Sequence, residues 1–482
     1  MNKIFFLVTA LFILTAGKAQ TNIGTDTTTV IILSANDMHA KIDNFPKFKA
    51  LVDNYRQHYE NVLVVSAGDM FTGNPIVDQY PDKGFPMIEL MNRVGFTIGT
   101  IGNHEFDYGQ ETLKRRIAQA QFPLISANIA SPDSIGINPD AYRIVSLNNG
   151  IKIGFVGAIQ LNSEGLPDSH PSKLGGIQFT DGITRIKEYR SLRDSCNIFV
   201  GLTHLGFEDD VELANQFGEF DVILGGHSHT LVTNPVEYNS VLVMQAGSSL
   251  KNLGLITIKL VGGKVVSKKA ELISVLDYPE VDSTLLSIVD RFNDNKELNK
   301  VIGTAQNDIT GNDELGSLMT DGMCSLDEIE IAFQNVGGIR VDILPKGNIT
   351  IKDVYKLDPF GNEIILLKMN VSEIKSLILN AFNREKAIDL VASGIAYTVI
   401  ANSKGIGTEV KLFMPDGSDV DASKVFATGL SSYIVSSYDF KHEDPGQSLY
   451  TTTAQALINF ISAKKEVNYT GIKRVSVSQK AD

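Results

Sequence analysis

Seven side chains of the types that bind metal ions lie in five short stretches of the sequence, and each stretch follows an apolar run. They are Asp37, His39, Asp69, Asn103, His204, His227 and His229. Carboxylate oxygens together with imidazole nitrogens suit Mn, Zn, Fe or Co better than Ca. An aspartate after a strand is often only a helix cap, and a single histidine is often structural, but the same placement recurs here five times. We therefore interpret the set as a candidate metal site.

The number of candidate ligands exceeds what one tetrahedral ion can use. Two divalent ions about 3.5–4 Å apart that share one carboxylate would use all of them. The stretch at residues 102–107 also carries His104, Glu105 and Asp107, so an amide, an imidazole and two carboxylates occupy one turn. An ordinary surface turn uses such residues one at a time, and this turn is therefore the centre of the predicted site.

The apolar runs before these stretches predict buried strands. They span residues 30–35, 62–66, 96–101, 198–202 and 222–224. Open α/β sheets place their chemistry in the loops at the carboxyl ends of the strands, where all seven candidates fall. Segments with apolar residues at helical spacing, such as 45–59 and 110–121, lie between the runs. This alternation of strand, polar loop and helix predicts a largely parallel or mixed α/β core.

Three predictions concern the segments between these runs. Residues 124–129 are expected to form one strand, and residues 180–193 are expected to form one amphipathic helix. Strands are predicted at residues 144–147 and 151–160, and Asn148-Asn149-Gly150 between them is a hairpin signal.

Length and composition describe a folded protein of more than one domain. The chain has 482 residues, of which 43% are hydrophobic and 21% charged, and this is too long for a single core. Its formal net charge of -13 argues against wrapping a nucleic-acid polymer, which needs a basic face. A small anionic ligand held by metal ions or by a few local arginines remains compatible with this charge.

The N-terminus resembles an export signal. Lys3 precedes an apolar run at residues 4–14 that is too short to span a membrane, and small residues at 16–19 predict cleavage before Gln20. We expect a signal peptide at residues 1–19, a periplasmic or extracellular location and no membrane span in the mature chain. Cys196 and Cys324 lie far apart in the sequence, so no disulfide framework is expected, and both are predicted to be buried.

Several motifs together resemble one protein family. Asp37-x-His39, Gly68-Asp69, the run Gly102-Asn103-His104-Glu105, His204 and Gly226-His227-Ser228-His229 are similar to the signature of the calcineurin-like metallophosphoesterases. Asn103-His104-Glu105-Phe106-Asp107 is the form found in the 5'-nucleotidase branch. The runs at 335–340 (NVGGIR) and 359–362 (PFGN) resemble the C-terminal substrate domain of the same branch.

The resemblance implies an α/β protein of two domains. A four-layer α-β-β-α metallophosphoesterase sandwich is expected at residues 28–272, and a linker helix at 273–300. A smaller α/β 5'-nucleotidase C-terminal domain is expected at residues 301–482, with the active site between the two domains.

The resemblance also implies a role for each candidate residue of the metal centre. Asp37, His39 and His229 would hold one divalent ion, Asn103, His204 and His227 the second, and Asp69 would bridge them. His104 would face the phosphoryl group, and Asp107 would orient His104. A nearby carboxylate favours the protonated imidazole, which can stabilise phosphoryl charge. The ions could be Mn, Zn, Co or Mg, and the sequence leaves that choice open.

The second domain is expected to bind the rest of the substrate. By resemblance, Phe360 and Tyr433 would sandwich a base, Asp439 would bind the ribose, and Asn335, Arg340 and Asn362 would hold other polar groups. For Phe360 or Tyr433 alone, core packing is an alternative. Two departures from the family pattern change this pocket: Ser437-Tyr438 stands where Gly-Gly is usual, and an arginine is absent near Gly311. Because both departures remove or displace polar contacts, we expect weak discrimination among bases.

The predicted function is that of an exported dimetal phosphohydrolase that releases phosphate from nucleoside monophosphates. A 2',3'-cyclic nucleotide, a nucleotide sugar or another phosphoester are alternative substrates, since the same metal centre would serve them all. A binding protein that has lost turnover is the alternative from another class. The oligomeric state is left open.

Overall fold

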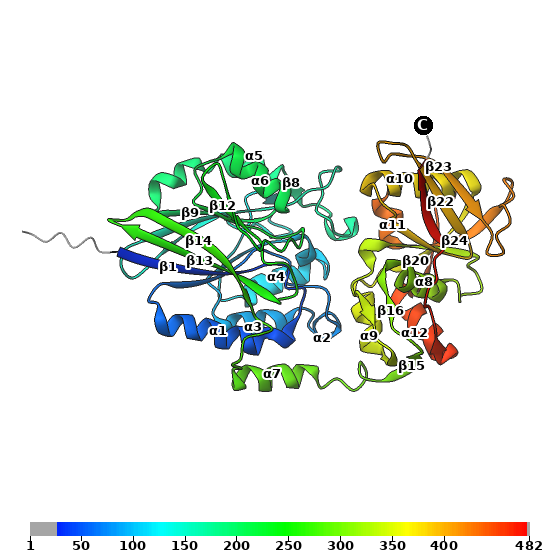
Figure 1. Ribbon diagram of the computed structural model, residues 1–482, viewed down its shortest axis with the longest axis horizontal. Coiled ribbons are helices and arrows are strands. Elements are labelled where there is room, and N and C mark those ends of the chain that lie inside the picture. The colour runs from blue at the N-terminus through cyan, green and yellow to red at the C-terminus, as the bar shows by residue number, and fades with distance from the viewer. Residues whose placement is uncertain (1–26, 480–482) are drawn as a thin grey trace, which may run out of the picture.

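The computed structural model describes residues 27–479, which form two domains side by side (Figure 1). The predicted signal peptide, residues 1–19, lies outside the described residues. The first domain contains two six-stranded sheets, and the second contains a five-stranded sheet with smaller sheets around it. The family's expected order of domains is therefore present, with the larger sandwich first.

The first sheet has the order β14-β13-β1-β2-β3-β4. Strands β1 (Thr27–Ala35), β2 (Val62–Ser66), β3 (Ile98–Thr100) and β4 (Leu124–Ile125) are parallel to one another, while β13 (Asn252–Val261) runs antiparallel to its two neighbours, β1 and β14 (Lys264–Ser274). Strands β1 to β3 are nearly continuous runs of buried apolar residues, as expected for parallel strands covered on both faces. Their carboxyl ends consequently lie at one edge of the sheet.

The second sheet has the order β11-β12-β10-β9-β7-β6. Its parallel strands are β7 (Lys152–Ile159), β9 (Ile198–His204), β10 (Val222–Leu224) and β12 (Val241–Met244), with antiparallel β6 (Tyr142–Ser146) and β11 (Glu237–Tyr238) at its two edges. The predicted hairpin is confirmed, since β6 pairs with β7 across the turn at 147–150. This sheet therefore also brings several strand ends to one side.

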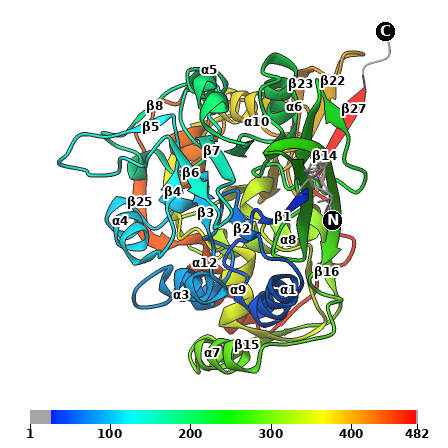
Figure 2. The same cartoon turned by 90° about the vertical axis from the view of Figure 1, so that its left-hand side faces the viewer.

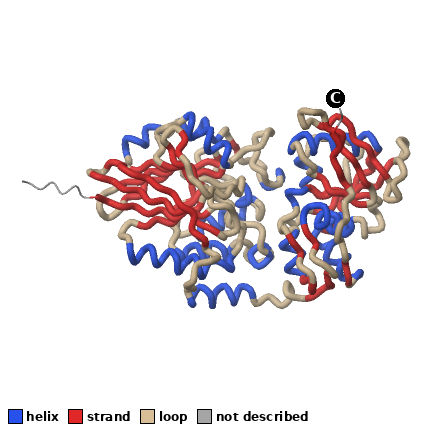
Figure 3. The backbone as a smooth tube through the Cα atoms, viewed as in Figure 1, coloured by secondary structure: helices blue, strands red, loops and turns tan. Residues whose placement is uncertain are grey.

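Helices cover the outer faces of both sheets (Figures 2 and 3). Helices α1 (Phe45–His58), α3 (Phe85–Val94) and α4 (Gln110–Gln119) cover the first sheet, and α5 (Gly182–Lys187) and α6 (Phe207–Gln216) cover the second. Between the sheets, buried side chains such as Ile32, Val65, Phe155 and Leu202 form one apolar cluster. The predicted four-layer α-β-β-α sandwich is confirmed.

Two predicted elements differ from the structure. Residues 124–129 form two short strands, β4 and β5 (Ile129–Ala130), instead of one. The buried side chain of Asn128 causes this break, because it bonds to the backbone N–H and carbonyl of Ile159 and draws the chain away from the first sheet. Residues 180–193 form α5, which is followed by a separate 3₁₀ turn at Arg190–Ser195. Such turns often follow α-helix ends.

The central sheet of the second domain has the order β21-β17-β24-β20-β25. These strands are β21 (Leu390–Ser393), β17 (Ile331–Asn335), β24 (Val425–Ser431), β20 (Glu363–Asn370) and β25 (Gln447–Thr452), and the surrounding helices are α8 (Gly311–Met323), α9 (Ile351–Leu357), α10 (Val371–Glu385), α11 (Ser432–Ser437) and α12 (Thr453–Lys464). Two three-stranded sheets lie beside it: β19 (Gly347–Thr350), β15 (Val301–Ala305) and β26 (Glu466–Val467), and β23 (Gly407–Phe413), β22 (Ala396–Ala401) and β27 (Val475–Gln479). The smaller α/β second domain is thus confirmed.

The segment between the domains is not a free tether. Helix α7 (Ser283–Asn293) packs along α1 and buries Leu285, Ile288 and Val289 in the core of the first domain. Only a short stretch then remains before β15 begins at Val301 (Figure 1). Any hinge between the domains is therefore confined to about the residues after Asn293.

Two further expectations from the sequence concern membrane-spanning helices and the two cysteines. Among residues 27–479, no helix is long and apolar enough to cross a membrane. Cys196 and Cys324 are both free thiols, as expected, but each is half-buried instead of fully buried.

Candidate metal centre and active site

The structure brings all seven predicted ligands together at the facing strand ends of the two sheets. Asp37 and His39 follow β1, Asp69 follows β2 and Asn103 follows β3, while His204 ends β9 and His227 and His229 follow β10. All five strands are parallel within their sheets, so their carboxyl ends meet on one side of the sandwich. Three overlapping groups of ligand atoms form there: Asp37 with His39 and His229, Asp37 with Asp69 and His204, and His39 with Asp69 and His104.

Five of these residues are held in a backbone conformation that side chains rarely adopt. The φ angles are positive at Asp37 (48°), His39 (45°), Asp69 (52°), His227 (80°) and His229 (54°). Such conformations cost of order 1–3 kcal/mol each and persist only where the surroundings enforce them. Their concentration in the ligand loops indicates that the fold stabilises this arrangement of side chains against local preference.

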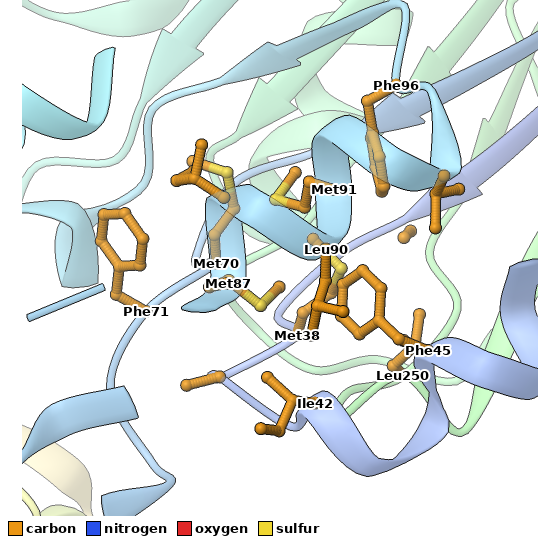
Figure 4. Close-up of a cluster of buried hydrophobic side chains, with 14 of the residues drawn as sticks. Met38, Ile42, Phe45, Met70, Phe71, Met87, Leu90, Met91, Phe96 and Leu250 are labelled. Atoms are coloured by element: carbon orange, nitrogen blue, oxygen red, sulfur yellow. The ribbon is translucent and has the colours of Figure 1, made fainter. Parts of the chain in front are cut away.

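Buried methionines anchor the ligand loops after β1 and β2 in the core of the first domain. Met38 lies between two of the ligands and Met70 follows Asp69, and both are fully buried. Figure 4 shows them packed with Met87 and Met91 of α3 in the core of the first domain. Alternate residues of each loop thus point into the core, which leaves the ligand side chains on the opposite side.

The first candidate ligand group centres on two facing imidazoles. The Nε2 atoms of His39 and His229 lie 2.8 Å apart, and His229 Nε2 lies 3.6 Å from Asp37 Oδ1. His39 Nδ1 lies 3.1 Å from the carbonyl oxygen of Thr72. Because a carbonyl only accepts, Nδ1 carries the proton and Nε2 presents a lone pair to the site, as metal-binding histidines do.

The second candidate group centres on His204, which is fully buried. Its Nδ1 donates to the carbonyl of Ala67 at 2.7 Å, and its Nε2 lies 3.1 Å from both Asp69 Oδ2 and Asn103 Oδ1. His227 Nδ1 lies 3.1 Å from the same Asn103 oxygen. His204 Nε2 therefore points to a place where the two oxygen acceptors also converge.

The charges of the side chains around Asp69 and His204 favour a bound cation. Burial lowers the pKa of His204, but the carboxylates of Asp69 and Asp37 outweigh this effect and raise the pKa to about 10. Burial raises the pKa of Asp37 to about 7 and lowers those of His227 and His229 to about 3 and about 4. The neutral imidazoles of His227 and His229 and the buried carboxylates of Asp37 and Asp69 are the donor set that divalent metal ions take, and a bound ion would replace the proton that these carboxylates favour on His204.

Gly102 and Gly226 allow the ligand loops to approach this closely. A Cβ atom on Gly102 would lie 2.3 Å from Asp69 Oδ1, and one on Gly226 would lie 2.6 Å from the carbonyl oxygen of Ala67. Both distances are shorter than side chains permit. The glycines of these motifs are therefore required by close packing around Asp69 and His204.

Glu105 positions the proposed bridging carboxylate. It is fully buried, and its carboxylate accepts hydrogen bonds from the backbone N–H groups of Asp69 (2.9 Å), Met70 (2.7 Å) and Gly102 (2.6 Å). It thereby ties the loop after β2 to the loop after β3. The sequence showed Glu105 within the motif, but nothing local to it revealed this role, which depends on contacts across 35 residues.

Replacing Glu105 with glutamine is expected to weaken metal binding by about 10–100-fold, as is typical when a residue that supports metal ligands is lost. The amide can accept on one side only and turns an N–H₂ group towards backbone N–H donors. Competition with a metal chelator measures the affinity. Glu111→Gln, at an exposed position of α4, is the matched control and should leave affinity unchanged. Equal affinity in both variants would exclude the positioning role.

His104 is placed beside the ligands with its own carboxylate partner. Its Nδ1 lies 2.6 Å from Asp107 Oδ2, and its Nε2 lies 3.9 Å from Asp69 Oδ2. Asp107 is held in turn by the hydroxyl of Ser169 at 3.0 Å. Burial lowers the pKa of His104, but the carboxylates of Asp69 and Asp107 outweigh this effect and hold it above its usual value. The imidazolium form is thus favoured at the edge of the ligand cluster.

A cavity of about 800 Å³ joins this cluster to the second domain. Among the predicted substrate residues, Asn335, Arg340, Phe360, Asn362 and Tyr433 line it, together with Asp69, Asn103, His104, Asp107, His227 and His229 of the first domain. Two of the contacts across the domain boundary lie at the cluster itself: Arg340 Nη2 lies 3.4 Å from His39 Nε2, and the rings of Phe360 and His104 stack with centroids 5.9 Å apart. The predicted substrate residues thus meet the candidate metal centre directly.

The structure does not place Asp439 in this cavity. Its side chain is exposed, and it is absent from the residues that line the cavity. Tyr438, the residue before it, is instead turned inward and is 8% exposed. The bulky ring at this position takes the inward place, whereas the usual glycines would leave that space free.

The loop after β7 contributes residues that the sequence did not reveal. Asp168, Ser169 and His170 line the cavity, and the backbone carbonyl of Asp168 accepts a hydrogen bond from Asn103 Nδ2 at 3.0 Å. This bond orients the Asn103 side chain so that its oxygen faces His204 and His227. The loop carries no recognisable ligand spacing, so only the tertiary structure identifies it.

Two family models match the chain. The model described as calcineurin-like phosphoesterase matches residues 31–231, and that described as 5'-nucleotidase, C-terminal domain, matches residues 297–440. Together they cover the candidate metal centre and most of the predicted substrate residues. The order of the two models agrees with the order of the two observed domains.

Individual proteins are similar over most of this chain. The 5'-nucleotidase of Vibrio cholerae is 26% identical over 71% of this chain and 74% of its own length. Endonuclease YhcR of Bacillus subtilis is 28% identical over 86% of this chain, which spans only 38% of that longer protein. A crystal structure of a 5'-nucleotidase precursor from Thermus thermophilus superposes with a TM-score of 0.83 at 24% identity, over 94% of this chain and all of that one, which shows a shared fold. With both family models matched in order, the chain is similar in each of its two domains to the calcineurin-like metallophosphoesterases that carry a 5'-nucleotidase C-terminal domain.

Proposed function

We propose that this protein is an exported dimetal phosphohydrolase that releases phosphate from nucleoside monophosphates. The observation that carries the proposal is one cavity in which four of the seven proposed metal ligands, Asp69, Asn103, His227 and His229, and His104 share the wall with Arg340 and Phe360 of the other domain. A substrate whose phosphate lies at the ligand cluster can thus contact the second domain with the rest of the molecule. The similarity to 5'-nucleotidases over most of the chain supports the choice of a nucleotide as that group.

The proposed ligands divide between two divalent ions, as the resemblance implies. Asp37, His39 and His229 would hold one divalent ion, and Asn103, His204 and His227 the other, with Asp69 shared. Bound there, the ions would activate water as a nucleophile and neutralise negative charge on the phosphoryl oxygens.

The protein's own residues would position the phosphoryl group and stabilise its charge. His104, protonated through its contact with Asp107, would donate a hydrogen bond to a phosphoryl oxygen as charge develops there. Arg340 lies on the opposite wall, 3.4 Å from His39 Nε2, and its guanidinium can bind another oxygen.

Phosphate release from a substrate panel tests the proposal. The panel contains nucleoside monophosphates, diphosphates, 2',3'-cyclic nucleotides, a nucleotide sugar and an aryl phosphate, each with Mn, Zn, Co or Mg added. We expect the highest kcat/KM with nucleoside monophosphates. A higher value with a cyclic nucleotide or nucleotide sugar would assign the chain to that activity instead. No turnover with any metal would favour a binding protein.

Phe360→Ala should raise KM for nucleoside monophosphates by about 10-fold and leave aryl phosphate hydrolysis within about twofold, since base–aromatic stacking contributes ~1–3 kcal/mol. Initial rates with both substrates measure the effect. Tyr450→Ala removes another aromatic ring of the second domain, 89% exposed, and should change neither substrate. Equal losses on both substrates in Phe360→Ala would remove the base-stacking role.

Export is proposed from the N-terminal sequence. Mass spectrometry of the protein recovered outside the cytoplasm should show a chain that begins at Gln20. Recovery only from the cytoplasm with Met1 retained would contradict it.

A further inference from the structure

Four strand ends of the second domain's central sheet line one edge of the cavity. Strand β17 ends at Asn335 and β24 ends at Ser431, and the two are parallel. The antiparallel neighbours β21 and β20 begin at Leu390 and Glu363 on the same edge. The residues just outside these ends therefore form one continuous wall. Three of the four ends supply predicted substrate residues, and the fourth, before β21, supplies Asp389.

Asp389 is a buried carboxylate that faces this cavity. It is 6% exposed and lines the cavity, and its backbone carbonyl accepts a hydrogen bond from Val336 N at 2.7 Å, next to Asn335. Within residues 27–479, no lysine, arginine or histidine forms an ion pair with Asp389. A buried carboxylate is costly unless hydrogen bonds satisfy it, and it offers about four lone-pair positions. The hydroxyl of Tyr438 donates to its Oδ2, the backbone N–H of Val336 lies beside it, and Arg384 acts on it by charge alone, so accepting positions remain for a ligand.

Tyr438 and Arg384 hold this carboxylate in place. Tyr438 donates to Asp389 Oδ2, and its ring packs edge-on against Tyr433, with centroids 6.3 Å apart. The guanidinium of Arg384, which also lines the cavity, lies 4.4 Å from the centroid of the Tyr438 ring. Tyr438 is one of the two residues that replace the Gly-Gly pair usual in the family. The replacement of Gly-Gly by Ser437-Tyr438 therefore adds a polar contact to the pocket, the hydrogen bond from Tyr438 to Asp389.

We propose that Asp389 binds the nucleoside end of the substrate by accepting hydrogen bonds from two neighbouring donor groups, with Tyr438 and Arg384 as its positioning residues. This rests on the proposed function, because it takes the substrate to be a nucleotide. Two parts of a nucleotide present such a donor pair: the vicinal hydroxyls of the ribose, which aspartates bind in other nucleotide sites, and the N1–H and N2–H₂ edge of guanine. The inference assigns to Asp389 the role that resemblance gave to Asp439.

The two sources of the donor pair lead to different selectivity. If the ribose supplies the hydroxyls, all four common nucleoside monophosphates bind similarly, which agrees with the weak base discrimination expected from the sequence. If guanine supplies the pair, GMP is preferred to IMP, which lacks the 2-amino group. Comparing GMP with IMP, and AMP with 2',3'-dideoxy-AMP, separates these two cases.

The test compares Asp389→Asn with wild type on nucleotides and on an aryl phosphate. We expect KM for the preferred nucleotide to rise about tenfold while kcat stays within about twofold, because a lost binding contact that does not change in the transition state affects KM. Aryl phosphate hydrolysis should stay unchanged. The variant should also lose its discrimination between GMP and IMP, or between AMP and its dideoxy analogue. Tyr438→Phe should raise KM less, by about threefold, with kcat unchanged.

Asp439→Asn is the matched control, since it makes the same chemical change at an exposed residue outside the cavity. An unchanged nucleotide KM in Asp389→Asn, or a raised KM in Asp439→Asn alone, would overturn the inference. Circular dichroism checks folding, and if Asp389→Asn does not fold, Tyr438→Phe decides by the same comparison.

Calorimetric titration with adenosine and guanosine separates failure of this inference from failure of the proposed function. If wild type hydrolyses neither nucleotides nor aryl phosphate, the proposed function is wrong. Tenfold weaker nucleoside binding to Asp389→Asn than to wild type would still support the inference, and equal binding would overturn it.

Discussion

Replacing Asp69 with alanine is expected to reduce phosphate release to background and to remove metal from both proposed positions. Asp69 is 1% exposed and belongs to two of the three ligand groups, where its Oδ2 lies 3.1 Å from His204 Nε2. A shared carboxylate contributes to both ions, so its loss weakens both. Its Oδ1 also accepts the backbone N–H of His104 at 2.9 Å, so the variant disturbs the catalytic loop as well.

Metal analysis after dialysis and initial rates at saturating metal measure both effects of Asp69→Ala. Asp53→Ala removes a carboxylate from α1, where it pairs only with Lys49, and is the matched control. Asp69→Asn keeps the size of the side chain, so a folded Asp69→Asn protein without metal would exclude misfolding as the cause. Wild-type rates with two ions bound in Asp69→Ala would contradict the bridging role.

His104→Ala is expected to retain its metal ions and to lose ~10²–10³ in kcat, the usual loss when a preorganised donor to developing charge is removed. The structure places His104 Nε2 3.9 Å from Asp69 Oδ2, while Asp107 at 2.6 Å holds the other ring nitrogen. These two carboxylates favour the imidazolium form, which donates towards the phosphoryl group. Asp107→Ala should lose less, because it leaves the imidazole in the cavity.

Metal content distinguishes this role of His104 from that of a ligand, since His104 also belongs to one of the ligand groups. Both measurements are made on the same preparation of His104→Ala, with His58→Ala, at an exposed position of α1, as the control. Loss of one ion per chain from His104→Ala would assign the residue to the metal. Full turnover would remove it from the reaction.

The positions of the candidate ligands could be predicted from the sequence because they are local. Each ligand lies within a few residues of a strand end, and apolar β-branched runs identify such ends without tertiary information. The parallel order of the strands then brings the five loops together. The alternation of strands and helices predicted the mixed α/β core, and the four-layer arrangement was implied only by the resemblance that the motifs carried.

The supporting residues could not be predicted because their roles depend on distant parts of the chain. Glu105 acts through backbone N–H groups more than 30 residues away, and Asp168 acts through its carbonyl on Asn103. Asp389 faces the cavity only because β21 pairs with β17. Tyr438 points inward and leaves Asp439 exposed because of the volume of its ring. The resemblance could not reveal this, because the family has glycine at that position.

The most direct test of the central claim is the number of metal ions bound by the wild-type chain, measured together with its activity. The protein, freed of metal by chelation and then loaded with Mn and dialysed, is predicted to hold two ions per chain. Phosphate release from a nucleoside monophosphate should fall to background on chelation and return only when the second ion binds. Full activity with one ion per chain, or with none, would contradict the account.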